Sequence, residues 1–251
     1  PRCSPRFGTL TRVTRLHNLR KASSQIVRRE REVLSFVAIR VVIGWVLGLA
    51  GQHIFYIFER SWTIANRNPF TEWDAVHYLR IAYSGYDVHL TPFFPLYPLL
   101  VRFVHFGSLG LLGYEAAGIA LGIVTLSGAA VVMRRFLSEL LDEDSARFGV
   151  LLLLWSPASV FLLSNYNLSL LVLLLSLCSL ALLRGNFMWS SVAASLAAVA
   201  HPLGLGGVVA VGVALIVNRR WKEFLPCICV SLSGLVAYCF YLTLKFSSPL
   251  V

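Results

Sequence analysis

Residues 33–58 read VLSFVAIRVVIGWVLGLAGQHIFYIF, an apolar run that is long enough to cross a membrane. About 20 apolar helical residues span the roughly 30 Å of bilayer hydrocarbon. The whole chain has this character, because 57% of its 251 residues are hydrophobic and only 14% are charged. Soluble domains carry about 25% charged residues. The sequence therefore predicts an all-α polytopic membrane protein, a multi-span helical bundle.

A basic tail precedes this first run. Residues 1–32 contain nine Lys and Arg against Glu30 and Glu32, so most of the formal net charge of +10 lies there. Basic residues that flank a span stay cytosolic, so we expect 1–32 to be a cytosolic tail that contacts anionic lipid. No nucleic-acid-binding fold accompanies the charge, and we expect no nucleic-acid partner. The lack of acids before Glu30 also fits a transit peptide. Arg40 lies inside the run and is expected to snorkel back to the cytosolic surface.

The rest of the chain, 33–251, is expected to form one transmembrane domain that is incomplete at its C-terminus, since it stops in an apolar context. The positions of Lys and Arg predict which later runs cross the membrane. The predicted spans are 116–133, 148–164, 168–183 and 224–244, with 187–200 and 203–217 as a hairpin that turns at His201–Pro202.

The segment 93–106 is interrupted by Pro95, Pro98, Arg102 and His105, and we expect it not to cross the bilayer. With this segment at the surface, the Arg-rich loops all fall on the cytosolic side. The loop 59–92, the turn 164–167 and the turn at His201 then face one extracytosolic compartment. Functional chemistry is expected in that compartment, where short surface helices lie in the first loop.

The loop 59–92 contains the stretch TEWDAVHYLRIA at 71–82, with a helix expected over Ala75–Tyr83. Asp74 is the leading catalytic candidate. If Trp73 and Tyr78 desolvate its carboxylate, its pKa rises and it can act as a general base. The alternative is that Asp74 caps the helix that follows it.

His77 would share a helix face with Asp74. One Asp and one His form a poor ligand set, and the cysteines have no zinc spacing, so we expect no metal and no cofactor. Arg80 and His201 are candidates to bind a phosphate, or they are simply solvated and interfacial. The Pro-rich aromatic stretch 93–98 is a candidate wall for a lipid. The substrate-binding candidates are Trp73, Glu72, His77, Arg80, Phe94, Tyr97, Asn167 and His201.

Several of these motifs resemble those of the GPI mannosyltransferase 2 family. The first block is Trp73-Asp74 with Leu79, Ile81-Ala82, Gly85-Tyr86 and 94–98, and the second is 156–161 with Tyr166, Ser169 and Leu170. The similarity covers about residues 36–217. It implies a GT-C-like bundle in the endoplasmic reticulum membrane, with a catalytic acid in the first lumenal loop.

The resemblance also implies a reaction. The enzyme would transfer the second mannose of the GPI-anchor precursor from dolichyl-phosphate-mannose, as an α-1,6-mannosyltransferase. Its partners would be membrane lipids, the two lipid-linked substrates and an accessory membrane subunit. The chain departs from the family at Asn167, where an acid is usual, and at His201, where Arg is usual. A non-catalytic membrane subunit or truncated paralogue is therefore the alternative, with a transporter as a third class.

Overall fold

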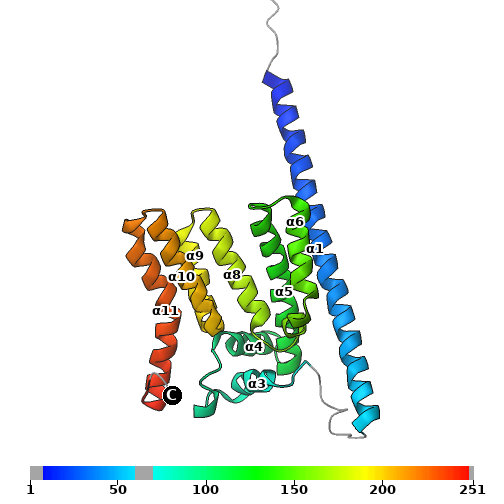
Figure 1. The fold of residues 1–251 in the computed structure, drawn as a ribbon, viewed down its shortest axis with the longest axis vertical. Coiled ribbons are helices and arrows are strands. Elements are labelled where there is room, and N and C mark those ends of the chain that lie inside the picture. The colour runs from blue at the N-terminus through cyan, green and yellow to red at the C-terminus, as the bar shows by residue number, and fades with distance from the viewer. Residues whose placement is uncertain (1–7, 60–69, 249–251) are drawn as a thin grey trace, which may run out of the picture.

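The computed structural model describes residues 8–59 and 70–248, and these residues form helices and no strands. Figure 1 shows upright helices side by side, a long slanted helix at one edge, and short helices across one end. The elements are α1 (Gly8–Glu59), α3 (Asp74–Ser84), η1 (Val88–Leu90), α4 (Leu96–Gly107), α5 (Tyr114–Ser138), α6 (Glu143–Trp155), η2 (Pro157–Ser159), α7 (Val160–Leu163), α8 (Leu168–Leu183), α9 (Phe187–Ala200), η3 (Pro202–Gly204), α10 (Leu205–Val217) and α11 (Trp221–Phe246).

The helical membrane fold is confirmed. Among the described residues, three helices are long and apolar enough to cross a membrane: Ser23–His53 within α1, α5, and α11. The pair 143–155 and 157–163 would make a fourth span if its bend is counted within one crossing. Helices α8, α9 and α10 are shorter and lie between these in the bundle (Figure 1).

The structure shows no break between the basic tail and the first span, which were expected to meet at residue 33. Helix α1 runs through it without interruption. Val33 and Val37 are buried against α5 and α6, while Ile39 and Val42 on other faces are half exposed or more. The first apolar run is therefore one edge of the bundle.

The loops α5–α6, α8–α9 and α10–α11 lie at the end of the bundle opposite α3 and α4 (Figure 1). Arg residues flank these loops, as the sequence predicts: Arg134 and Arg135 in the last turns of α5, Arg147 in α6, Arg184 after α8, and Arg219 and Arg220 after α10. The end is held by ion pairs between helices: Arg29–Glu143, Arg135–Glu30, Arg147–Glu32 and Arg184–Glu139. The side chains are only partly buried, with 30–51% of each exposed, so each pair contributes at most about 1 kcal/mol.

The predicted span 148–164 is not one straight helix. Helix α6 ends at Trp155, and the chain turns by 64° into the segment 157–163. Pro157 cannot donate a backbone hydrogen bond and keeps Ser156 extended, with ψ of 151°. Arg40 does not snorkel back to the basic end. It donates to the carbonyl of Leu154 (2.8 Å) and to the Ser159 hydroxyl (2.9 Å) at this bend.

The hairpin of α9 and α10 forms where it was predicted. Helix α9 is rich in Ala and Ser, which lets neighbouring helices approach closely. At one crossing Gly234 of α11 donates its N–H to the Ser195 hydroxyl at 2.9 Å. The break after Ala200 comes at Pro202, and the turn there lies at the same end as α3 and α4, where His201 shares a cavity with Asp74.

Helix α4 lies across that end rather than alongside the upright helices (Figure 1). Its 12 residues rise only about 18 Å, too little to cross a bilayer. Tyr97 and Val101, on the inner face of α4, are fully buried against α5 and α8. This agrees with the prediction that 93–106 does not cross with the other helices.

Candidate functional site

The three polar segments expected to face one compartment meet at a cavity of about 380 Å³. Four sequence candidates line it, and they come from three separate regions of the chain. The lining residues are Trp73, Asp74, Tyr78, Phe161, Tyr166, Asn167, Leu168 and His201. Phe161 and Tyr166 belong to the second motif but were not predicted as site residues, and Leu168 was not predicted to have a role.

The turn that leads into α3 is strained at Trp73. Its φ of 56° and ψ of −128° match the second position of a type II′ turn, where glycine is usual. The N–H of Ala75 donates to the carbonyl of Glu72 at 3.3 Å and closes the turn. Such a conformation costs a non-glycine residue about 1–3 kcal/mol and persists only where its surroundings hold it.

Asp74 is the first residue of α3 and does not cap it. The cap position is Trp73, and no side chain there accepts a hydrogen bond. The alternative prediction, that Asp74 caps this helix, is therefore wrong. The carboxylate is exposed at the cavity, so the expected desolvation by Trp73 and Tyr78 is also wrong for the protein alone. A bound substrate would have to exclude water from it.

The backbone on both sides of Trp73 is bonded to Tyr166. The N–H of Asp74 donates to the Tyr166 hydroxyl at 3.2 Å, and that hydroxyl donates to the Glu72 carbonyl at 3.4 Å. Burial raises the pKa of Tyr166. The hydrogen bond from the Asp74 N–H lowers this pKa, and the negative charge of the Asp74 carboxylate raises it. The hydroxyl therefore keeps its proton for the Glu72 carbonyl.

The turn 164–167 is anchored by Asn165, which is fully buried. Its N–H donates to the Phe70 carbonyl at 2.9 Å, and its side-chain oxygen accepts from the Tyr97 hydroxyl at 3.4 Å. A Cβ at Gly118 would lie 1.9 Å from that oxygen, so only glycine fits there. Tyr97 was expected to wall a lipid site. It lies instead in the core, because its hydroxyl finds partners inside.

Asn167 joins the turn to the end of α9. It is 2% exposed, and its amide nitrogen donates to the carbonyl of Ala200. The carbonyl belongs to the last turn of α9, where backbone acceptors lack helical partners. A carboxylate at this position could not donate to it, which gives this chain a physical reason for having an amide there.

His201 is next to that carbonyl, partly buried, and part of the cavity wall. Its Nδ1 accepts the N–H of Leu203 at 3.1 Å. That bond requires an unprotonated Nδ1, so the proton of the neutral ring is on Nε2. Burial lowers the pKa of His201, which favours the same neutral form. The ring can therefore offer Nε2–H as a donor without a positive charge.

The remaining candidates lie outside the cavity. Arg80 pairs with Asp87 at 2.8 Å on an exposed face, and Phe94 packs on Tyr238 with ring centroids 5.7 Å apart. The exposed His77 ring lies 4.7 Å from that of Phe93. Glu72 contributes its backbone carbonyl to the turn. Within the part of the chain that the structure describes, no three His, Cys, Asp or Glu residues gather where they could hold a metal ion.

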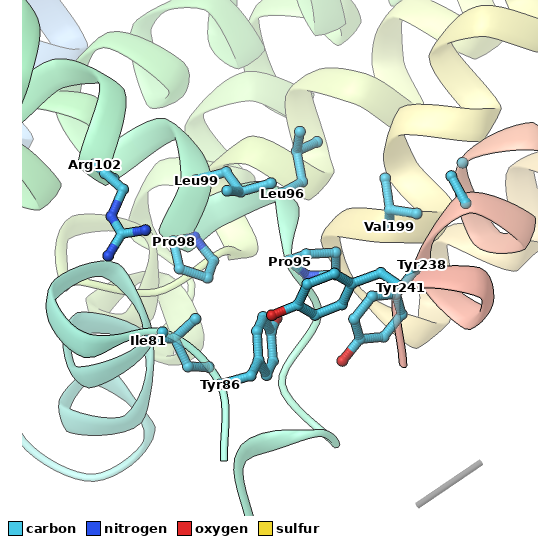
Figure 2. Close-up of a pocket in the computed structure, with 13 residues that line it drawn as sticks. Ile81, Tyr86, Pro95, Leu96, Pro98, Leu99, Arg102, Val199, Tyr238 and Tyr241 are labelled. Atoms are coloured by element: carbon cyan, nitrogen blue, oxygen red, sulfur yellow. The ribbon is translucent and has the colours of Figure 1, made fainter. Parts of the chain in front are cut away.

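A second cavity of about 490 Å³ lies toward the C-terminal end of α3, between α4 and α11. Figure 2 shows its wall of aliphatic and aromatic side chains, with the Arg102 guanidinium at one end. Arg102 donates to the carbonyls of Ala82 and Tyr83 at the end of α3, at 2.7 and 3.0 Å. Tyr78 and Ile81, one helical turn apart on α3, line the first and second cavity respectively.

A comparison with protein families gives one match. The family described as Mannosyltransferase (PIG-V) matches residues 56–241, which is most of the chain and includes every lining residue of both cavities. No curated protein and no solved structure matches. The chain therefore belongs to the PIG-V family of GPI mannosyltransferases, glycosyltransferases that work in a membrane with a lipid-linked sugar donor.

Proposed function

We propose that this chain transfers the second mannose to the GPI-anchor precursor in an α-1,6 linkage, from dolichyl-phosphate-mannose, at the lumenal face of the endoplasmic reticulum. One observation carries the proposal. Asp74 and His201, 127 positions apart in the sequence, line the same cavity at the end of the bundle opposite the basic loops. The Arg-rich loops at the opposite end of the bundle favour a cytosolic position for that end, which supports a lumenal position for the cavity.

Asp74 acts as the general base. It takes the proton of the acceptor hydroxyl while the new bond forms between that oxygen and C1 of mannose. The bond between C1 and the phosphate oxygen breaks on the opposite face, and dolichyl phosphate leaves with the electron pair. Nε2–H of His201 donates to a phosphate oxygen and stabilises the negative charge that develops there. No metal or cofactor takes part.

His201, and not Arg80, has the phosphate role in this proposal. Arg80 already pairs with Asp87 and is not part of the cavity wall. The neutral donor makes a weaker phosphate contact than an Arg would, since hydrogen bonds to charged donors are roughly twice as strong.

The apolar second cavity suits the hydrocarbon part of a lipid-linked substrate. Its lining is almost entirely apolar, and Leu99 and Tyr241 on its rim are 58% and 39% exposed. A lipid chain there would lie alongside α3, with its polar head directed to the N-terminal end of α3 where Asp74 lies. The adjacent 380 Å³ cavity would hold the reacting groups.

The experiment is rescue of cells that lack transfer of the second mannose. The intact chain should restore surface GPI-anchored protein, and Asp74→Asn at equal expression should not. Asp87→Asn is the matched control. Asp87 is a partly exposed acid of the same polar segment that lies outside the cavity, and an amide oxygen there can still accept the N–H of Leu90. Failure of the intact chain to rescue would favour the non-catalytic alternative.

A further inference from the structure

Tyr166 bonds to the two peptide groups on either side of one strained residue. Its hydroxyl accepts from the N–H of Asp74 (3.2 Å) and donates to the carbonyl of Glu72 (3.4 Å). Between those two groups lies Trp73, whose positive φ is one that L-residues rarely adopt. The hydroxyl therefore uses both its donor and an acceptor site on the same turn.

The start of α3 has no side-chain cap of its own, because Trp73 occupies the cap position. The N–H of Asp74 is one of the backbone donors that lack a helical partner. A residue 92 positions away in the sequence supplies that partner. The direction in which the Asp74 side chain leaves the helix thus depends on a contact from the turn 164–167.

Tyr166 is itself held in place from two sides. Its ring packs edge-on against Phe161, with centroids 5.2 Å apart, and Phe161 in turn lies 6.3 Å from the Trp73 ring. The neighbouring Asn165 is bonded to the carbonyl of Phe70 at 2.9 Å, just before the strained turn. The hydroxyl consequently has little freedom to move away from the turn.

We propose that Tyr166 is a positioning residue: its hydroxyl holds the strained turn at Trp73 and so aims the Asp74 carboxylate at the acceptor hydroxyl. This inference rests on the proposed function of Asp74. A general base acts only within hydrogen-bond reach of the proton that it removes, and a misplacement of 1 Å can reduce a rate by about 10²-fold. The hydroxyl therefore contributes to turnover without contacting the substrate.

The test is Tyr166→Phe, which removes the hydroxyl and keeps the ring on Phe161. We expect kcat for mannosyl transfer to fall by about 10- to 100-fold with KM within about twofold, since only the aim of the base changes. Ser190→Ala is the control. It removes a buried hydroxyl that donates to the Cys178 carbonyl at 3.1 Å between α8 and α9, and its kcat should stay at the wild-type value.

The same substitution in a Trp73→Gly variant distinguishes a positioning role of Tyr166 from a general loss of structure. Glycine adopts a positive φ without strain, so the turn in Trp73→Gly needs the hydroxyl less. Tyr166→Phe should therefore lower kcat several-fold less in the Trp73→Gly chain than in the wild-type chain, although Trp73→Gly has its own effect through the lost indole.

Two results would overturn the inference while wild-type turnover is intact: Tyr166→Phe with kcat within twofold of wild type, or equal losses in both backgrounds. Absence of turnover in the wild-type chain would instead contradict the proposed function.

Discussion

Gly118→Ala tests the contact on which the candidate site is built. A Cβ at this position would lie 1.9 Å from the side-chain oxygen of Asn165 and 3.2 Å from the Tyr97 hydroxyl. To reach even 3.0 Å the Asn165 oxygen would have to move by about 1 Å, and Asn165 is fully buried. Overpacking costs about 1–3 kcal/mol, and loss of the Tyr97 hydrogen bond adds about 1 kcal/mol.

Alanine also gains up to about 1 kcal/mol of helix propensity over glycine. The net destabilisation by Gly118→Ala is therefore about 1–3 kcal/mol. Gly122→Ala, one turn further along α5, is the matched control. Its nearest neighbours would be at 3.7 and 3.9 Å, an ordinary contact, so it should gain propensity alone and stabilise the protein by up to about 1 kcal/mol.

Thermal unfolding of both variants in the same detergent measures the difference. A gap of about 3 kcal/mol corresponds to a separation in melting temperature on the order of 6–12 °C for a chain of this size. Because Asn165 precedes Tyr166, Gly118→Ala should also lower the rate of mannosyl transfer, and Gly122→Ala should not. Equal melting temperatures for the two variants would refute the close approach of α5 to the turn 164–167.

Asn167→Asp should lower stability by about 1–3 kcal/mol in thermal unfolding, because the buried Ala200 carbonyl loses its donor; Asn218→Asp, in an exposed loop, is the control and should change little. Burial lowers the pKa of His201, so its contribution to folding is complete above pH 6.5 and declines as pH falls below that value. His201→Asn should remove this decline, and an unchanged pH profile of unfolding would contradict it. Arg80→Gln should keep transfer near the wild-type rate, since Arg80 lies outside the cavity; a loss above tenfold would return it to the site.

Much of the bundle could be predicted because hydropathy and Lys and Arg positions act over whole segments. The hairpin at His201–Pro202 and the separate path of 93–106 both followed from prolines and charge. The break at Ser156–Pro157 was missed. An apolar run continues through it, and the bend depends on a partner for the freed backbone, which Arg40 supplies from α1.

The site was predictable where residues act through their own chemistry. Asp74, Trp73, Asn167 and His201 do line one cavity. Tyr97 was misplaced, because an aromatic belt and a buried core tyrosine look alike in a sequence. The role of Tyr166 had no local signal, since its contacts join residues more than 90 positions apart.

The most direct test of the central claim is the rate of mannosyl transfer from dolichyl-phosphate-mannose by purified Asp74→Asn, compared with wild type and Asp87→Asn. Asparagine preserves shape and removes the basic function. Loss of a general base lowers rates by about 10²–10⁴-fold, and we expect a loss in that range for Asp74→Asn only. Transfer by Asp74→Asn within threefold of wild type would contradict the account.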